Sequence, residues 1–136
     1  MTSWVLFATL TFLSWGLWGF LPKFALKHLD PQSTLIYQGL GSMLVLPAVL
    51  VARRFNLQFH PAGVAFAVAS GFLGALGALC FLLALSQGKV AVVVSYSALY
   101  PLVTIALSML VLRETLTLNQ GIGILFALLA VLFLSR

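Results

Sequence analysis

Residues 62–86 read AGVAFAVASGFLGALGALCFLLALS, and no side chain in this stretch carries a charge. A helix needs about 20 predominantly apolar residues to cross the hydrocarbon of a bilayer, so this stretch is long enough to span one. Apolar and polar residues do not alternate along it, which argues against a strand of a membrane β-barrel. The stretch therefore predicts a transmembrane helix, and four further stretches share its properties.

The composition of the whole chain agrees with a membrane location. Of its 136 residues, 62% are hydrophobic and 7% are charged, whereas a soluble domain has about 45–50% apolar and about 25% charged residues. So few charged side chains cannot cover the surface of a small globule. The composition excludes a soluble enzyme, a disordered chain and a disulfide scaffold, and it predicts an integral membrane protein.

Apolar runs with polar boundaries predict an all-α integral membrane fold of five transmembrane helices. They occupy about residues 4–21, 33–52, 62–86, 90–112 and 118–134. The connections are short, so successive helices are expected to be antiparallel neighbours in a single domain over residues 3–135.

Local signals mark several helix boundaries. Asp30 followed by Pro31 places a capping carboxylate before a proline at the first helical position. Thr117 and Gln120 have the spacing of a capping box. Gly88 suits the left-handed residue that ends many helices. These signals fall where hydropathy already predicts a break.

The charges that flank the predicted helices are almost balanced between the two membrane surfaces. The net charge is +5, from seven Lys and Arg against two Asp and Glu. An odd number of helices places Arg53, Arg54 and Arg113 on one side and Lys23, Lys27, Lys89 and Arg136 on the other. Orientation follows an excess of Lys and Arg on one side. Three against four is almost no excess, which predicts insertion in both orientations. The basic residues form no stripe, so we expect no nucleic-acid partner.

The polar residues predict neither an enzyme nor a metal site. The chain has two histidines, one cysteine and two acids, which are too few and too scattered for a catalytic or metal-binding constellation. Asp30 and Glu114 both stand at helix ends, so no carboxylate lies within a span to relay protons. We expect no catalytic residue, cofactor or metal.

The helix at 90–112 carries the most informative polar residues. Tyr96, Tyr100 and Thr104 recur every four residues and would share a helical face. Pro101 lacks an N–H, so the carbonyl of Ser97 loses its helical partner. A freed carbonyl beside hydroxyls predicts a ligand site near the bilayer midplane. The alternative is a kinked helix whose hydroxyls bond to its own backbone.

The first two predicted helices add aromatic and polar side chains to this substrate site. They are Ser14, Trp15, Trp18, Gln38 and Ser42. An aromatic cavity with few charges suits a small, neutral or weakly cationic amphipathic solute. Lys23 either extends to the headgroups or turns inward, where it would bind a carboxylate.

Small residues recur at intervals of four on the helix at 62–86. Such rows let helix backbones approach closely in lipid. We expect these residues of the helix, Gly74 and Gly77, and the helix-end residues Lys23 and Glu114, to be structural or gating residues.

Two parts of the sequence resemble the EamA domain of the drug/metabolite transporter superfamily. They are Ser14-Trp15-Gly16 through Pro22-Lys23, and the runs SALYPLVT (97–104) and LRETLTLNQGIG (112–123). The resemblance implies a five-helix half of an inverted-repeat transporter, in which Glu114 matches the family's acid after the fourth helix and Pro101 its mid-helix proline. Relatives often carry Arg near the position of Tyr37 and Gln38, and its absence here disfavours an anionic substrate.

The sequence therefore predicts a small-molecule secondary transporter of the bacterial inner membrane. We expect it to work by alternating access as an antiparallel homodimer or paired with a homologous half, with the lipid bilayer and a small-molecule substrate as partners. The alternative is a non-transporting membrane subunit that packs in a larger membrane complex.

Overall fold

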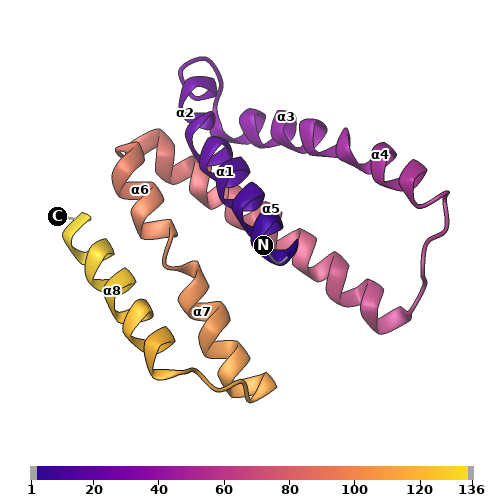
Figure 1. The fold of residues 1–136 in the computed structure, drawn as a ribbon. Helices are drawn as coiled ribbons and strands as arrows, with labels where there is room; N and C mark the ends of the chain where they lie inside the picture. Colours follow the sequence, from indigo (N-terminus) through magenta and orange to yellow (C-terminus); the bar gives the residue numbers. More distant parts are fainter. Residues whose placement is uncertain (1–2, 135–136) are drawn as a thin grey trace. The chain divides into compact units, whose positions relative to one another are not determined.

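The computed structural model describes residues 3–134, and they contain helices and no strands (Figure 1). Arg136, one of the flanking charges, lies outside the described residues. The helices form two compact units, Met1–Gln87 and Gly88–Arg136. The predicted all-α membrane fold is confirmed.

Four helical stretches are long and apolar enough to cross a membrane, as predicted. They are Val5–Ala25, Pro31–Ala52, Pro61–Gln87 and Val90–Leu112. The fifth predicted span is α8 (Leu118–Leu134), which has 17 residues. At 1.5 Å per residue it is about 25 Å long, somewhat shorter than the hydrocarbon thickness of about 30 Å.

The first span ends later than the sequence predicts. Helix α1 (Ser3–Phe20) is followed after Leu21 by the short helix α2 (Pro22–Ala25). Proline is tolerated in the first turn of a helix because its missing N–H would have no helical partner there. Pro22 therefore begins a new helical turn and does not end the span.

The cap predicted at Asp30 is present. Asp30 precedes α3 (Pro31–Met43), and its side chain accepts hydrogen bonds from the Ser33 N–H at 2.8 Å and the Ser33 hydroxyl at 2.7 Å. The Ser33 N–H, and next the Ser33 hydroxyl, lower the pKa of the Asp30 carboxyl below its ordinary value. The helix begins at Pro31, as the capping signal predicts and two residues before the start that hydropathy predicts.

The single helix predicted at 33–52 is interrupted at Leu44. Helix α4 (Val45–Ala52) contains Pro47, which cannot donate to the carbonyl of Met43. Just before this point the Leu44 N–H donates to the carbonyl of Gly41, three residues earlier, at 3.2 Å. The turn there is tighter than an α-helical turn.

Helix α5 (Pro61–Gln87) carries the buried core of the first unit at its C-terminal end. It packs against α3 and α2. Leu82 and Leu85 are fully buried there, and Thr34 of α3 is buried as well. Residues 61–77 of the same helix are all exposed. The helices of this unit are therefore held together near one end.

The predicted helix at 90–112 is three consecutive helical pieces in the second unit. They are α6 (Val90–Ser97), α7 (Tyr100–Leu107) and a π-helical turn, η1 (Ser108–Leu112). The kink expected from Pro101 is an interruption at Ala98 and Leu99, because Pro101 lies in the first turn of α7. The π turn ends at Arg113, which has a left-handed φ of 56°.

Helix α8 packs against α6 and begins with the predicted capping box. The Thr117 N–H donates to Gln120 Oε1 at 2.8 Å, and the Gln120 N–H donates to the Thr117 hydroxyl at 3.4 Å. The left-handed conformation predicted for Gly88 is wrong, since no described glycine has a positive φ. Residue 90 already starts α6, so the chain continues directly into the next helix.

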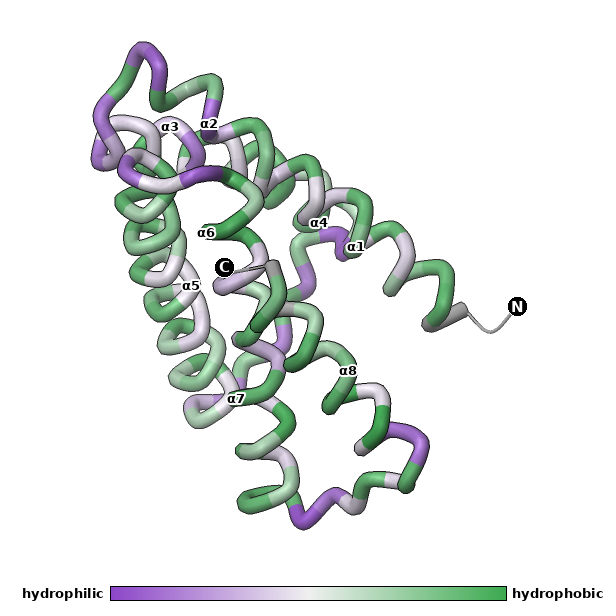
Figure 2. The backbone as a smooth tube through the Cα atoms, turned by 90° about the vertical axis from the view of Figure 1, so that its left-hand side faces the viewer, coloured by the Kyte–Doolittle hydropathy of each residue, from purple (hydrophilic) through white to green (hydrophobic). Residues whose placement is uncertain are grey.

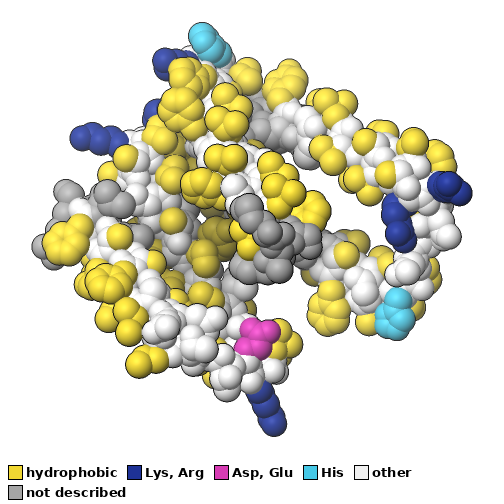
Figure 3. Space-filling model, in the orientation of Figure 1, with side chains coloured by type: hydrophobic (Ala, Val, Ile, Leu, Met, Phe, Trp, Pro, Cys, Tyr) yellow, Lys and Arg dark blue, Asp and Glu magenta, His cyan; other side chains and the backbone are white. Residues whose placement is uncertain are grey.

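Hydropathy follows the helices. Figure 2 shows hydrophobic residues along the helices and hydrophilic residues in the connections. In the space-filling view, hydrophobic side chains cover the visible helix surfaces, and Lys, Arg and His lie at helix ends and connections (Figure 3). An outer surface of this kind fits lipid and not water.

Candidate functional site

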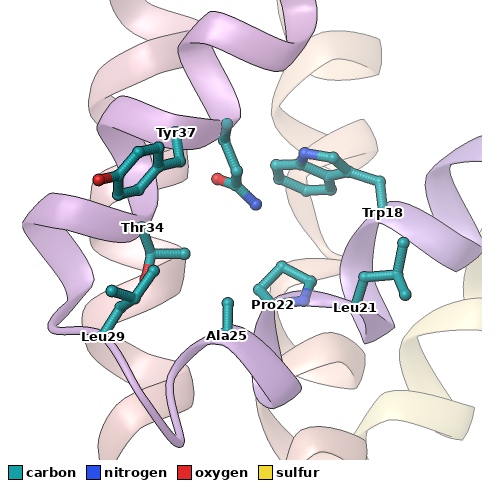
Figure 4. Close-up of a pocket in the computed structure, with 8 residues that line it drawn as sticks. Trp18, Leu21, Pro22, Ala25, Leu29, Thr34 and Tyr37 are labelled. Carbon is teal, nitrogen blue, oxygen red and sulfur yellow. The ribbon is translucent and has the colours of Figure 1, made fainter.

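A pocket of about 320 Å³ lies where the end of the first span meets the start of α3 (Figure 4). The chain reverses direction between Ala25 and Pro31 and brings these two segments together. The lining residues are Trp18, Leu21, Pro22, Ala25, Leu29, Thr34, Tyr37 and Gln38. None of these side chains carries a formal charge, so the pocket is apolar and aromatic with a few polar atoms.

Trp18 forms one wall of this pocket and is held from outside it. Its indole stacks on Phe81 of α5, with ring centroids 5.5 Å apart and planes 18° from parallel. Figure 4 places the Trp18 ring across the pocket from Tyr37 and Thr34. The stack fixes the orientation of the indole, so the wall is built before any ligand arrives.

Gln38 is a lining residue of this pocket and carries an unusual buried polar atom. Its Oε1 is buried and accepts no hydrogen bond, and it is the only such side-chain atom found among the described residues. Buried polar atoms in proteins almost always have a partner. The Thr34 hydroxyl, one turn earlier on α3, does not donate to this oxygen, because it donates to the Asp30 carbonyl at 2.9 Å.

Lys23 adjoins this region, but it is not part of the lining. Its Nζ donates a hydrogen bond of 2.6 Å to the Leu85 carbonyl of α5. Carbonyls in the last turn of a helix have no helical partner, so the ammonium satisfies one of them. Lys23 thus turns toward α5, and its charge is directed to a helix end.

Two of the predicted substrate residues, Trp18 and Gln38, are brought together by the pocket. Ser14, Trp15 and Ser42 are not among its lining residues, and the Ser42 hydroxyl bonds to the Gly39 carbonyl at 2.7 Å. The sequence missed the other lining residues because they depend on the chain reversal. The Asp30–Pro31 cap signals that a new helix starts after the connection, but it does not indicate which side chains meet across the reversal.

The predicted residues of the fourth span lie in the second unit. The break at Ala98 and Leu99 separates Tyr96, on α6, from Tyr100 and Thr104, on α7. Thr104 lines an apolar pocket of about 370 Å³ formed within α7 and η1; the other lining residues are Leu107, Ser108, Val111 and Leu112. The Ser108 hydroxyl donates to the Ile105 carbonyl of the preceding α7 at 3.0 Å.

The glycines predicted to be structural are open within the first unit. A Cβ atom added to Gly74 or Gly77 would meet no neighbour within 4 Å. Their packing role therefore stays a prediction that requires a partner beyond this unit. The described residues also contain no group of three or more His, Cys, Asp or Glu side chains suited to hold a metal.

Comparison with known proteins decides the family. The EamA-like transporter family matches residues 2–136 of the chain. The chain belongs to this family. It is also similar to an uncharacterized protein of Methanocaldococcus jannaschii, 43% identical over 70 residues, which are 52% of this chain and 51% of that relative. The match thus spans about half the length of that relative. No solved structure matches the chain.

Membership of the EamA-like family makes this chain an integral membrane protein of a transporter family and not of an enzyme family. The resemblance identified two family positions, and the structure locates both. Pro101 lies in the first turn of α7, and Glu114 follows the π turn, where its N–H donates to the Ser108 carbonyl at 3.4 Å. Pro101 therefore lies at the break within the fourth span, and Glu114 lies just after the end of that span.

Proposed function

We propose that this EamA-like chain is a small-molecule secondary transporter in which two copies, inverted relative to each other, work by alternating access in a bacterial inner membrane. The observation that supports it most is the match to a transporter family over residues 2–136. A ligand-sized pocket, lined by Trp18 and Gln38, gives the chain a place to bind a solute.

An inverted second copy would complete the transporter. Many transporters are built from two inverted repeats, with the substrate bound at their interface. A half with an odd number of spans needs a second copy in the opposite orientation to reproduce that arrangement. The open glycine row of α5, at Gly71, Gly74 and Gly77, offers a surface for close helix packing. The nearly balanced flanking charges permit both orientations.

The proposed substrate is a small, neutral or weakly cationic amphipathic molecule. Trp18 and Gln38 would receive it near one membrane surface. Ser14, Trp15 and Ser42 on the first two spans, with Tyr96, Tyr100, Pro101 and Thr104 on the fourth, are proposed to line its path nearer the midplane. Lys23, Glu114, Gly74 and Gly77 are proposed to support or gate this path.

Cysteine cross-linking tests the inverted arrangement. Cys80 is the only cysteine, so Cys80→Ala provides the background. His28 and Asn56 are exposed, lie in connections at opposite ends of the spans and are not among the flanking Lys and Arg residues. We expect His28→Cys in one copy to cross-link with Asn56→Cys in another. Cross-links that join only identical positions would indicate parallel copies and contradict the proposal.

Transport itself is tested by comparing metabolites inside and outside cells that lack or overproduce the chain. We expect one class of small solute to change in opposite directions in the two strains. The result is then repeated with purified protein in liposomes. The alternative function, a non-transporting membrane subunit, is favoured by the Ser42 and Ser108 hydroxyls, which donate to backbone carbonyls within their own spans. It predicts no solute change and co-purification with a larger membrane complex.

A further inference from the structure

We propose that the connection between the second and third spans, residues 53–60, is a lipid-binding segment that lies in the headgroup region of the bilayer, where Arg53 and Arg54 bind the phosphate of an anionic phospholipid. The segment reads RRFNLQFH, and all of its residues are exposed. It joins the ends of two helices that are long enough to cross a membrane, so it lies at a membrane surface. The proposal goes beyond transport, because it concerns the surrounding lipid and not the solute.

The first argument is that apolar and polar side chains alternate along this segment. The apolar ones, which are 67–80% exposed, are Phe55, Leu57 and Phe59. The polar ones are Asn56, Gln58 and His60. Figure 1 shows the chain drawn out between the end of α4 and the start of α5. Alternate side chains of an extended chain point to opposite sides, so the segment can present one apolar side and one polar side.

The headgroup region is the depth that suits such a segment. In water, three large apolar side chains would stay exposed, which the hydrophobic effect opposes. In the hydrocarbon core, backbone N–H and C=O groups outside a helix would lack hydrogen-bond partners, and residues 56–60 are outside any helix. Among the headgroups, the apolar side chains reach the acyl chains while the backbone keeps its water.

The second argument is the conformation of Arg54 at the end of α4. The Arg54 N–H donates to the Val51 carbonyl at 2.9 Å. The Phe55 N–H donates to the Leu50 carbonyl, also at 2.9 Å. This pair of bonds forms a Schellman cap, whose left-handed residue is usually glycine. Arg54 takes that place with a φ of 50°, at a conformational cost that glycine would not have. The cap does not require an arginine, which leaves the guanidinium for another role.

The third argument is that Arg53 and Arg54 have no carboxylate nearby in their own unit. The one acid of that unit is Asp30, at the other end of the second span, which has 22 residues. At 1.5 Å per residue this span is about 33 Å long, well beyond the screening length of about 8 Å at physiological salt. The other acid, Glu114, directly follows Arg113. Two adjacent guanidinium groups attract phosphate, which arginine binds through paired hydrogen bonds.

Quenching of a single tryptophan by brominated lipids tests the depth of the segment. Trp4→Phe, Trp15→Phe and Trp18→Phe combined with Phe59→Trp leave one tryptophan, beside the arginines, in the full-length chain. The chain is reconstituted in nanodiscs of phosphatidylcholine and phosphatidylglycerol, which have the same composition on both faces, so either orientation gives the same signal. We expect lipids brominated near the headgroup to quench this tryptophan more strongly than lipids brominated at the chain ends.

The headgroup preference is measured by placing the bromines on one of the two lipids at a time. One arginine near an anionic surface contributes about 1 kcal/mol, a factor of about five, so phosphatidylglycerol should be preferred about fivefold or more. Arg53→Gln with Arg54→Gln should lower the preference below about twofold. Lys27→Gln with Lys89→Gln removes the same charge from exposed residues in the connections at the other ends of the spans, and it should leave the preference unchanged.

Arg54→Gly separates the charge of this residue from its place in the cap. Glycine takes the left-handed conformation without strain. This variant should therefore resist unfolding by SDS, followed by circular dichroism, at least as well as the parent chain, while its preference for phosphatidylglycerol falls. Arg54→Lys keeps the positive charge and should retain most of the preference.

The proposal is overturned if phosphatidylglycerol is preferred less than about twofold, if chain-end bromines quench most strongly, if Arg54→Gly keeps the full preference, or if the lysine control lowers it equally. Glycerol phosphate dissolved in the buffer should leave the preference unchanged. Displacement of the lipid by it would show a site for a soluble phosphate and would also overturn the proposal. The comparison of the two lipids needs no arginine variant, so it decides the question even if those variants misfold.

Discussion

Replacing Lys23 by methionine tests how the first span is fastened to α5. Methionine keeps most of the apolar stem and removes the ammonium that donates to the Leu85 carbonyl at 2.6 Å. Hydrogen bonds to charged groups contribute about 1.5–3 kcal/mol in soluble proteins, whereas those measured between membrane helices average about 0.6 and reach about 1.7 kcal/mol. The Lys23 ammonium is part-buried near a helix end, so we expect a loss of about 1–2 kcal/mol.

The free energy of unfolding is measured in mixed micelles with increasing SDS, followed by circular dichroism. A loss of about 1–2 kcal/mol raises the unfolded-to-folded ratio about 5- to 30-fold. Lys27→Met is the matched control, because Lys27 is exposed and its Nζ lies 5.2 Å from the centre of the Phe24 ring. It should change stability by less than about 1 kcal/mol. Equal effects of the two substitutions would show that Lys23 extends to the headgroups and would refute the reasoning.

Three further predictions concern α3, the substrate path and orientation. Asp30→Ala should increase amide exchange at the start of α3 relative to Asp30→Asn, because asparagine can still cap the helix. The pKa of Asp30 is lowered in the folded chain, so its carboxylate stabilises the fold at pH values above the ordinary carboxyl pKa. Hydrogen exchange should show that this stabilisation is lost as the pH falls through the lowered pKa. Thr104→Val and Tyr100→Ala should abolish solute transport with insertion unchanged, and full transport by a Thr104→Val, Tyr96→Phe, Tyr100→Phe triple variant would make these hydroxyls structural. Reporters fused after residue 136 should give signal on both sides of the membrane, and two lysines added to one connection should shift the population to one orientation; a single orientation in the unmodified chain would contradict dual insertion.

Features set by neighbouring residues are predictable from this sequence. The Asp30 cap and the Thr117–Gln120 capping box depend on side chains that reach only three residues along the chain. The interruption before Pro101 follows from a missing N–H. The break at Leu44 has the same origin, because Pro47 also lacks an N–H. A prediction from hydropathy alone does not include this break, since the whole segment is apolar.

Features set by distant residues are not predictable in this way. The contact of Lys23 with Leu85 joins residues 62 positions apart, and both directions for Lys23 were compatible with its place in the sequence. Trp18 and Gln38 could be selected as polar or aromatic residues within spans, but their common pocket depends on the chain reversal between them. The π turn at Ser108–Leu112 has no comparable local signal.

The concentration of contacts near the C-terminal end of α5 makes this helix a lever. Its buried residues Leu82 and Leu85 act as the fulcrum, while residues 61–77 are exposed. The distance along the helix from Pro61 to Leu82 is about 30 Å at 1.5 Å per residue, so a tilt of about 10° at the fulcrum moves Pro61 by about 5 Å. Phe81, which carries the Trp18 wall, lies beside this fulcrum. A rotation of α5 about this end would therefore move Pro61 several times farther than it moves Phe81.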